Sequence, residues 1–503
     1  MNYYRPEWTC GRYNPKHHVA LMYNLIEGIS FFFEAESALI VGIILSYSRN
    51  AKIEIDKMLQ QCNIERSIIL EFLEELYDVG LLSKEPPTPQ IIKNYRIAFA
   101  NNSVNSLTEN DNSELVSEAE DDYNNAIKED SLCSAVIELT YKCSAQCIHC
   151  YNPGATRNST EIDHRKLSDE LNFDEYRKVI DELYDLGCYK VTLTGGDPFS
   201  KPIVWDIIQY LYDKDIAFDI YTNGIQIENE VLRLIKYYPK SISISLYSGI
   251  AKDHEFITRV KGSFEKTLST IEQISNYGIP LILKCCIMRP NIKSYYLVEN
   301  IAHKYSAAVQ FEVSLQDSLD GDHCVSTFLQ LPQEMLEIVL RDKRIPLYVG
   351  IENENYGAIK RITTDKTCHA GETSFCITPN GNVQLCVAFP MILGNVKEQN
   401  IKEIITDNIL LSKWQETTLK DFEDCGKKEY CQYCVICAGC NFVANGTYLK
   451  ACSNNCFIAQ CRYQLAEKLK KGYDPLMGKS VIDCLSKFDN SIPVLKRITT
   501  HNG

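Results

Sequence analysis

Cysteines are unevenly distributed along this 503-residue chain, and their positions constrain its fold more than any other feature. Of the 22 cysteines, Cys143, Cys147 and Cys150 stand close together in the spacing C-x3-C-x2-C. Eleven more lie between Cys368 and Cys461. Disulfide scaffolds belong to short secreted chains, whereas this chain is long and its N-terminus lacks a basic segment followed by an apolar one. The pattern therefore predicts metal ligation in a cytoplasmic protein.

The overall charge excludes one class of partner. The formal net charge is −14, and an acidic chain neutralises few phosphates, so we expect no nucleic-acid partner. The longest apolar runs, such as residues 38–45, are too short to span a bilayer, so we expect no membrane partner.

Short β-rich runs alternate with amphipathic helical patterns through the middle of the chain. Strands are predicted at residues 135–139, 190–196, 218–224, 241–247, 281–288 and 309–315, and helices at residues 172–187, 201–215, 228–238, 263–278 and 292–305. Six such β/α units predict a parallel sheet with helices outside it. Sheets of this kind bind ligands at the carboxyl ends of their strands, where the candidate motifs fall.

Three thiolates on a loop after the first strand can hold three irons of a [4Fe–4S] cluster and leave the fourth iron open. A partial zinc site is the alternative. The C-x3-C-x2-C motif before this β/α array resembles that of the radical SAM superfamily. The resemblance implies an α/β fold, a partial (β/α)6 TIM-like barrel. It also implies S-adenosylmethionine at the open iron and its reductive cleavage to a 5′-deoxyadenosyl radical. Cys143, Cys147 and Cys150 would then be the catalytic cluster ligands.

The resemblance also implies cofactor-binding residues at the other strand ends. Glycines there would bring the backbone close to the methionine part of the cofactor, and an arginine would pair with its carboxylate. The alternative to cofactor binding is a role in a turn for Asn223 and a place on the protein surface for Arg259. The family's Gly-Gly-Glu-Pro has Asp in place of Glu here. The residues are His149, Gly195, Gly196, Asp197, Pro198, Asn223, Ser245 and Arg259.

The C-terminal cysteines form a second field. Thiolates at this density select zinc or iron–sulfur clusters, and zinc ribbons are the alternative. Together with the three-cysteine loop, the field resembles the SPASM extension, which holds two auxiliary [4Fe–4S] clusters. The resemblance implies a first cluster on Cys368, Cys376, Cys386 and Cys440, and a second on Cys431, Cys434, Cys437 and Cys456.

The field departs from the family pattern. The usual C-x2-C-x5-C-x3-C is compressed to C-x2-C-x2-C-x2-C, and Cys425, Cys452 and Cys461 are surplus. One auxiliary iron could therefore be open to a substrate thiolate. We expect ligation, rather than a hydrophobic core, to organise residues 368–461.

The N-terminal residues predict a separate small domain. Residues 17–25 are strand-like, and residues 34–48 and 65–82 have helical apolar spacing, with a helix end at Gly80. This predicts a winged-helix-like α+β domain. DNA binding is one role for it. The other is recognition of a leader peptide by strand addition, with residues 17–25 as the edge, as in the recognition elements of peptide-modifying enzymes. Residues 101–130 hold nine acidic residues and one lysine, which predicts an acidic linker.

The predicted organisation is a leader-recognition domain at 1–100, a linker at 101–130, a radical SAM barrel at 131–345, a SPASM-like domain at 346–465, and a helix and tail at 466–503. By resemblance, the chain is expected to be a maturase of a ribosomally synthesised peptide, of the sactipeptide or ranthipeptide type, that forms thioether bonds. Its partners would be a precursor peptide with its leader and a low-potential electron donor such as ferredoxin or flavodoxin. Other radical modifications, such as carbon–carbon or ether cross-linking, epimerisation or formylglycine formation, and a non-enzymatic iron–sulfur or zinc winged-helix regulator are the alternatives.

Overall fold

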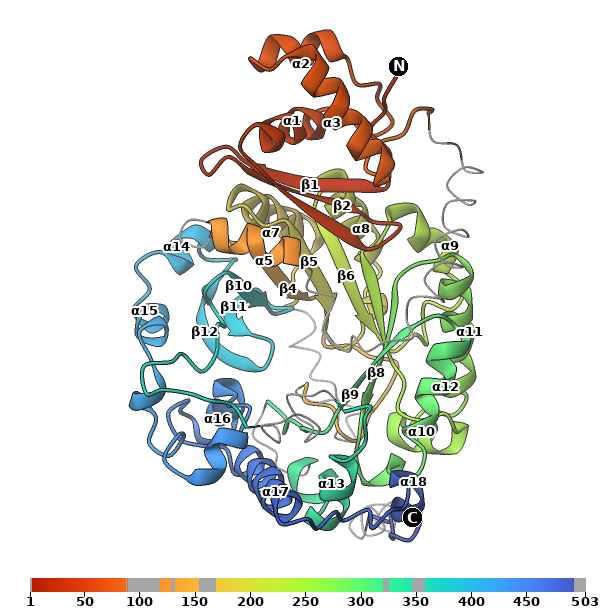
Figure 1. Cartoon of the computed structure of the whole chain (residues 1–503), viewed down its shortest axis with the longest axis vertical. Coiled ribbons are helices and arrows are strands. Elements are labelled where there is room, and N and C mark those ends of the chain that lie inside the picture. Colours follow the sequence, from red (N-terminus) through yellow and green to blue (C-terminus); the bar gives the residue numbers. More distant parts are fainter. Residues whose placement is uncertain are drawn as a thin grey trace.

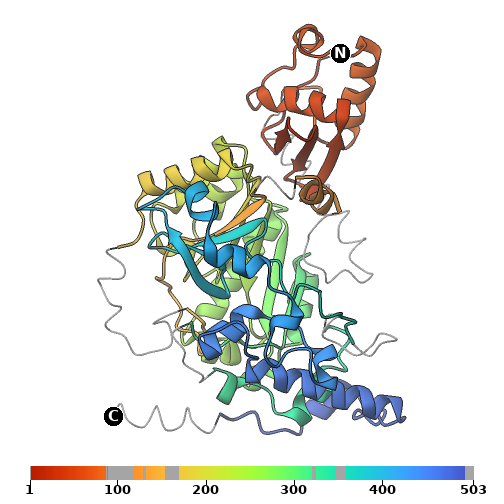
Figure 2. The same ribbon diagram turned by 90° about the vertical axis from the view of Figure 1, so that its left-hand side faces the viewer.

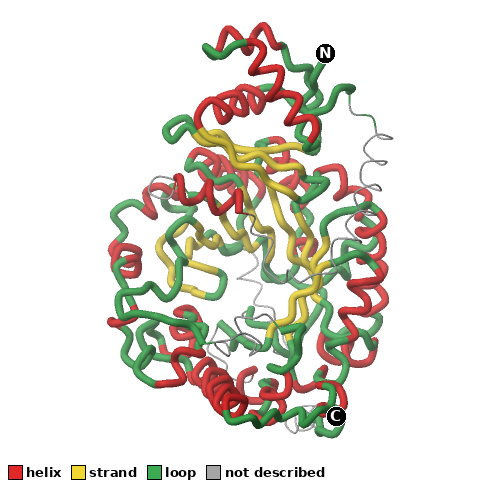
Figure 3. The backbone as a smooth tube through the Cα atoms, in the orientation of Figure 1, coloured by secondary structure: helices red, strands yellow, loops and turns green. Residues whose placement is uncertain are grey.

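The computed structural model describes residues 2–86, 88, 118–127, 132–152, 169–319, 325–345 and 358–492. It has three parts: an N-terminal module, a curved central sheet covered by helices, and a cysteine-rich region that follows in the chain (Figures 1 and 2). Figure 3 shows the strands gathered in two sheets, a small one under the N-terminal helices and a large one in the centre.

The N-terminal module is a three-stranded antiparallel sheet followed by three helices. Gly28, with φ 71°, forms the turn between the second and third strands, and α3 ends just before Gly80, with φ 72°. The winged-helix-like α+β fold expected from the sequence is thus present. Its elements are β1 (Thr9–Asn14), β2 (Val19–Asn24), β3 (Ile29–Glu34), α1 (Ala35–Ser46), α2 (Ile55–Gln61) and α3 (Arg66–Asp78).

The prediction that residues 17–25 offer a free strand edge is wrong. They form β2, which is the central strand and pairs with β1 on one side and β3 on the other. Every residue of β2 is buried. A run of apolar residues reads as a strand from the sequence, but its place in the sheet depends on pairing with strands elsewhere. Within the described residues, β3 pairs with β2 alone, so β3 is an edge.

The acidic segment after the module is not simply a linker. Residues 118–127 form helix α5 (Glu118–Ile127), which packs against β2 and β3. Its buried face holds Glu120, Tyr123 and Ile127, at helical spacing. The acidic composition hid this face, because one of its three buried residues is itself a glutamate. The rest of the predicted linker, residues 101–117 and 128–130, lies outside the described residues.

Buried charges fix the module and α5 to the base of the central sheet. Glu120 is 1% exposed and accepts hydrogen bonds from Tyr23 of β2, at 3.0 Å, and from Lys240, at 2.5 Å. It also pairs with Lys190. Burial alone would raise the pKa of Glu120, but the two lysines outweigh it and hold that pKa below its ordinary value. We call these four residues the Glu120 cluster.

A second ion cluster lies at the same junction. Arg5 is 2% exposed and its guanidinium lies 2.6 Å from the Asp215 carboxylate, which Arg49 also approaches, to 2.8 Å. Arg49 additionally lies over the ring of Tyr212, 3.6 Å from its centroid. Paired and buried charges hold a defined geometry, so the module is an integral part of the molecule.

The central sheet begins with six parallel strands in the order β4-β5-β6-β7-β8-β9, as the sequence predicts for a partial barrel. The strands are β4 (Ser134–Glu138), β5 (Lys190–Thr194), β6 (Ala217–Thr222), β7 (Ser241–Ser245), β8 (Leu281–Cys286) and β9 (Ala308–Glu312). The covering helices are α7 (Phe173–Asp185), α8 (Val204–Asp213), α9 (Val231–Leu234), α10 (Ala251–Thr258), α11 (Ser263–Asn276) and α12 (Leu297–Lys304), with short helical turns η1 (Pro198–Ser200), η2 (Ile235–Tyr237) and η3 (Arg289–Asn291).

Helix α7 shows why these segments are helical. Asn172 and Glu175 form a capping box at its start, and Tyr176, Val179 and Leu183 fall on one buried face. Such apolar faces cover the outer side of the sheet and build the main hydrophobic core.

Three further strands extend the sheet beyond β4. Strand β10 (Ser374–Ile377) pairs in parallel with β4, and β11 (Asn382–Cys386) and β12 (Phe389–Asn395) follow antiparallel. Apolar residues of this region, among them Phe375, Phe389 and Trp414, belong to the same core as the barrel. The expectation that ligation rather than a core organises residues 368–461 is therefore wrong. The high cysteine density masked an ordinary apolar pattern.

The remaining helices surround this extension. They are α13 (Gln333–Val339), α14 (Ile401–Ile405), α15 (Ile409–Gln415), α16 (Ala438–Asn445), α17 (Ser453–Lys470) and α18 (Val481–Leu485), with turns η4 (Val325–Leu329), η5 (Leu419–Asp421) and η6 (Glu429–Tyr433). In the described part of the chain, no helix has the length and apolar character needed to cross a membrane.

Candidate active site

The three-cysteine loop follows β4 directly and is anchored to the end of α10. The N–H groups of Gln146 and Ile148 donate to the carbonyls of Thr258, at 2.9 Å, and Ile257, at 3.0 Å. The loop thus sits at the carboxyl ends of the parallel strands, where the sequence places it.

Cys143, Cys147 and Cys150 lie close to one another on this loop. Burial raises the pKa of Cys147 well above its ordinary value, and the neighbouring Cys150 and Cys143 thiols add to this effect. Burial likewise raises the pKa of Cys143 to about 12. Burial thus disfavours the thiolate, the form that binds metal, so a bound metal would supply the stabilisation that the thiolates need here.

The glycine turn after β5 supports the first half of the loop. The N–H of Gly196 donates to the Thr140 carbonyl, at 2.7 Å, and that of Asp197 to the Lys142 carbonyl, at 2.9 Å. A Cβ on Gly196 would stand 2.2 Å from the Lys142 oxygen, and one on Gly195 2.5 Å from the Thr140 oxygen. The two glycines are therefore required for the loop backbone to pass across the turn.

Replacing Gly196 by Ala is expected to displace the three-cysteine loop. The clash is with backbone atoms, which cannot rotate away. We therefore expect the rate of reductive cleavage of S-adenosylmethionine to fall at least about tenfold, which corresponds to an increase of roughly 1.4 kcal/mol in the activation free energy. Deoxyadenosine release by chromatography measures it. Gly472→Ala is the control, because that glycine has nothing within 4 Å of its Cβ position and, with φ 78°, the change introduces backbone strain without a clash. Equal activity of the two variants would contradict this role of Gly196.

Asp197 has a structural role in the turn. It is fully buried, and its carboxylate accepts hydrogen bonds from the Phe199 N–H at 3.0 Å, the Thr222 hydroxyl at 2.7 Å and the Asn223 N–H at 2.9 Å. The adjacent Pro198 begins the short turn η1. Asp197 thereby joins the ends of β5 and β6.

Asn223 contacts the cysteine loop itself. Its side-chain amide donates to the Cys143 sulfur and to the Ser144 hydroxyl, each at 3.3 Å. Asn223 also has the turn role given as its alternative, because its side-chain oxygen accepts the Ile225 N–H at 2.9 Å; the left-handed residue of the turn, however, is Gly224, with φ 75°.

His149, Ser245 and Arg259 surround the rest of the loop. The His149 ring lies edge-on to Tyr247, with centroids 4.6 Å apart, and burial lowers the pKa of His149 to about 4. Ser245 hydrogen-bonds the Tyr247 side chain. Arg259, with φ 57°, ends α10, and its guanidinium and the Cys147 thiol lie within electrostatic range of each other. The structure thus brings every predicted cofactor-binding residue to one end of the barrel.

One buried carboxyl at this end was not identified from the sequence. Glu138, the last residue of β4, is 1% exposed, and its Oε1 atom has no hydrogen-bond partner among the described residues. Burial raises its pKa to about 7. The Glu138 carboxyl also helps to raise the pKa of the Cys376 thiol on the adjacent strand β10. Successive side chains of a strand point to opposite faces, and Ile137 faces outward, so Glu138 lies on the inner face of the sheet.

The C-terminal cysteines divide into two groups. In one, Cys437 lies close enough to Cys368 and Cys386 to raise the pKa of both thiols. The Cys437 sulfur accepts a hydrogen bond from the Cys440 N–H at 3.4 Å. Cys376 lies buried on β10, close to Cys386. The predicted second-cluster residue Cys437 therefore lies with the residues predicted for the first cluster.

In the other group, burial raises the pKa of Cys434 to about 12, and Cys456, Cys425 and Cys431 add to this effect. Cys425, which the sequence leaves surplus, thus lies with these three residues. Its C-x5-C spacing before Cys431 was a usable signal. Of the other surplus cysteines, Cys452 lies near Cys440, whereas Cys461 is buried on α17.

This donor set fits iron–sulfur clusters. In the described residues, no three His, Cys, Asp or Glu side chains form a ready cage for a single metal ion. Each thiolate of a four-iron cluster binds a different iron, so its ligands need not converge on one point. All are soft thiols in three separate groups, which is the chemistry that iron–sulfur clusters require.

The sequence matches two family profiles at these sites. Residues 137–293 match the radical SAM superfamily, and residues 368–441 match the SPASM iron–sulfur cluster-binding domain. The fold and the cysteine groups define an iron–sulfur enzyme of the radical type. The chain therefore contains a radical SAM domain and a SPASM domain. Its cofactors are accordingly S-adenosylmethionine, a [4Fe–4S] cluster and auxiliary iron–sulfur clusters.

Similar proteins include enzymes of several pathways. An AdoMet-dependent heme synthase of Methanosarcina barkeri is 26% identical, over 62% of this chain and 93% of its own. The subtilosin biosynthesis protein AlbA of Bacillus subtilis is 27% identical, over 64% and 68%. The mycofactocin maturase MftC of Mycolicibacterium smegmatis is 24% identical, over 64% and 77%. Among solved structures, Streptococcus suis SuiB bound to S-adenosylmethionine has a TM-score of 0.49 at 13% identity, covering 90% of this chain and 99% of its own.

Proposed function

We propose that this enzyme modifies a ribosomally synthesised precursor peptide and cross-links it through thioether bonds from peptide cysteines. Two of the similar proteins are named for peptide maturation, the subtilosin biosynthesis protein and the mycofactocin maturase. The observation that carries the proposal is the N-terminal module, which has a strand edge that no described residue pairs with and is joined to the radical SAM barrel through buried ion pairs.

The residues at the barrel end have distinct roles in this proposal. Cys143, Cys147 and Cys150 hold the cluster whose open iron binds S-adenosylmethionine, and the bound cofactor supplies the radical that removes a substrate hydrogen. Asn223 orients Cys143 through its amide. The pair Gly195 and Gly196 hold the loop in place. His149, Ser245 and Arg259 contact the cofactor.

The two C-terminal groups support a revised ligand assignment. Cys425, Cys431, Cys434 and Cys456 hold one auxiliary cluster, and Cys368, Cys386, Cys437 and Cys440 hold the other. Each assigned set then has four thiols, with Cys437 in place of the predicted Cys376, and the N-terminal loop keeps three. Electrons reach these centres from a low-potential donor such as ferredoxin or flavodoxin.

The leader peptide binds along β3, in place of the buried β2. Beside this edge, the Phe33 ring meets Phe72 of α3 edge-on, with centroids 5.8 Å apart. Ile68, one helical turn before Phe72, is 47% exposed. A strand edge that no described residue pairs with, and that lies beside apolar side chains, suits an extended peptide, whose backbone pairs with the strand while alternate side chains contact those apolar residues.

Replacing Ile68 by Glu is expected to weaken leader binding about tenfold or more, because one buried aliphatic side chain contributes roughly 1.5–3 kcal/mol. Fluorescence anisotropy with a labelled leader peptide of the enzyme's precursor measures it. Ser67→Glu is the matched control, since Ser67 is exposed on the same helix but lies about 100° away from Ile68 around the helix axis. Equal effects of the two changes would exclude leader binding beside Ile68.

The similarity to a heme synthase makes a tetrapyrrole the competing substrate. That match covers 93% of the heme synthase but leaves more than a third of this chain unmatched, so this chain has regions that enzyme lacks. Reconstituted enzyme, reductant, S-adenosylmethionine and the precursor peptide should give a peptide lighter by two hydrogens per cross-link in mass spectrometry. An unchanged peptide, together with conversion of a tetrapyrrole in a parallel incubation, would refute the proposal.

A further inference from the structure

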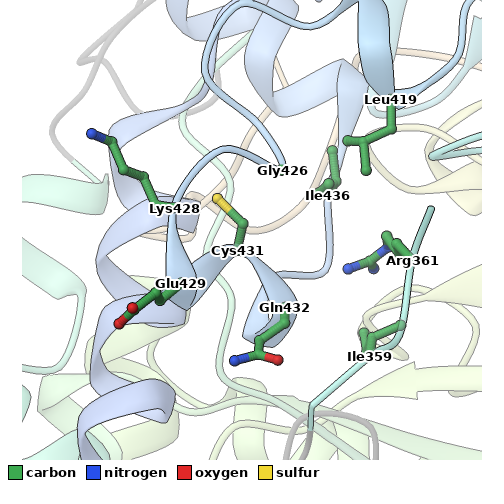
Figure 4. Close-up of a pocket in the computed structure, with 9 residues that line it drawn as sticks. All are labelled: Ile359, Arg361, Leu419, Gly426, Lys428, Glu429, Cys431, Gln432 and Ile436. Atoms are coloured by element: carbon green, nitrogen blue, oxygen red, sulfur yellow. The ribbon is translucent and has the colours of Figure 1, made fainter. Parts of the chain in front are cut away.

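The small pocket beside Cys431 does not form a separate site (Figure 4). Arg361, which also lines it, lies within electrostatic range of the Cys425 thiol. Both cysteines belong to the set proposed for an auxiliary cluster, so the pocket is part of the surroundings of that cluster. The inner face of the barrel sheet is different, because it carries a charged side chain that belongs neither to a cysteine group nor to the predicted cofactor contacts.

This side chain is Lys284, in the middle of β8. Its neighbours Leu283 and Cys285 belong to the core outside the sheet, so alternation along the strand places Lys284 on the inner face. Its ammonium lies 3.9 Å from the centroid of the Tyr221 ring on β6, and among the described residues it forms no ion pair. Charges inside proteins are usually paired, so a lysine whose only close neighbour is an aromatic ring suits an anionic ligand.

The neighbouring side chains leave this part of the inner face open. Tyr221 is 39% exposed although its strand pairs with β5 on one side and β7 on the other. The Lys284 side chain reaches the Tyr221 ring across β7, whose residues opposite these two are the small Ser245 and Ser243. The Ser243 hydroxyl is buried and has no hydrogen-bond partner among the described residues. An accessible ring and ammonium thus lie beside an unused polar group.

The nearest acids on this face are engaged elsewhere. On β6, Asp219 accepts a hydrogen bond from the Ser241 hydroxyl at 2.6 Å. On β9, Glu312 accepts one from the Ser314 N–H at 2.6 Å. Neither carboxylate pairs with Lys284, so the position keeps its positive charge for a ligand.

This position lies deeper in the barrel than the predicted cofactor residues. Asn223 follows β6 and Ser245 ends β7, whereas Tyr221 and Ser243 stand two residues earlier on the same strands. Two residues of a strand span about 6.5 Å. A group bound here is therefore below the cofactor, on the side from which a substrate would face it.

We propose that Lys284 and Tyr221 form a specificity site that binds an acidic side chain of the core peptide, the part of the precursor that is modified. The inference rests on the proposed function, because it takes a peptide as the substrate. The Lys284 ammonium pairs with the carboxylate, and the Tyr221 ring holds the ammonium in place. The contact fixes which peptide residue faces the cofactor, and no covalent bond is made or broken.

The test measures cross-linking and peptide affinity of the anaerobic holoenzyme, by mass spectrometry and by fluorescence anisotropy. Lys284→Gln should raise the KM and Kd of the precursor about tenfold or more, because a hydrogen bond between two charged groups is among the strong ones. Replacing one acidic core residue of the peptide by its amide should cause the same rise with the unmodified enzyme and no further rise with Lys284→Gln. Tyr221→Phe keeps the ring and should bind normally, whereas Tyr221→Leu should bind more weakly. Lys266→Gln, an exposed lysine on α11 outside the sheet, is the control.

Each other outcome decides the matter. An unchanged peptide affinity, or a loss that no acidic core position shares, would overturn the specificity site. A raised KM for S-adenosylmethionine in Lys284→Gln would show that the lysine holds the cofactor carboxylate and would equally overturn it. A precursor that binds in a Lys284-dependent way but is left unmodified would refute the proposed function and leave the specificity site standing.

Discussion

Replacing Cys143, Cys147 and Cys150 together by Ala should abolish cleavage of S-adenosylmethionine while leaving most of the iron bound. We propose that the three thiols are the ligands of one cluster, so removing them would remove the open iron that the cofactor needs. Because the other two cysteine groups lie elsewhere in the fold, about eight of roughly twelve irons per chain should remain. Deoxyadenosine release and iron analysis on the same anaerobic sample measure both quantities.

Cys461→Ala is the control for this variant. Cys461 is buried on α17, and its neighbours are Glu337, Lys468 and Arg462 rather than other cysteines. Its loss should leave both iron content and cofactor cleavage intact. Persistent cleavage in the triple variant would show that the loop is not the catalytic site, and zinc in place of iron would favour a structural scaffold.

Replacing Glu120 by Ala should release the N-terminal module from the barrel. The change leaves Lys190 and Lys240 buried without their shared carboxylate, and breaking a buried ion pair costs about 3–5 kcal/mol. Hydrogen exchange should then show β1, β2 and α5 losing protection while the barrel strands keep theirs. Peptide modification should fall, but dithionite-driven cofactor cleavage should not.

The exposed Asp121 on the same helix supplies the control, Asp121→Ala, which should leave exchange unchanged. The Glu120 contribution also has a defined pH dependence. The folded pKa lies below the ordinary value of 4.5, so the stabilisation is present above that pH and is lost as pH falls through the folded pKa. Equal protection in both variants would show that other contacts hold the module.

The sequence predicts the barrel well because its signals are local. Each strand of the parallel array is a short apolar run, and each helix, such as α7 with its capping box and buried face, repeats at the helical period. The glycine turn and the three-cysteine loop follow strands directly, so their meeting at one end of the sheet follows from the parallel topology.

What the sequence does not predict depends on pairing between distant segments. The position of β2 inside its sheet, the parallel pairing of β10 with β4, and the role of Glu120 in α5 all arise from contacts across long separations. The grouping of Cys437 with Cys368 has the same origin, because a compressed cysteine spacing does not fix which sulfurs share a cluster.

The most direct test of the central claim follows hydrogen from peptide to cofactor. Precursor peptide deuterated in its non-cysteine residues, incubated anaerobically with the enzyme, reductant and S-adenosylmethionine, should give deoxyadenosine that carries one deuterium, and the product should lose one alkylatable cysteine thiol per cross-link. Deoxyadenosine without deuterium, together with a peptide whose thiols all remain alkylatable, would contradict peptide cross-linking at the Cys143, Cys147 and Cys150 loop.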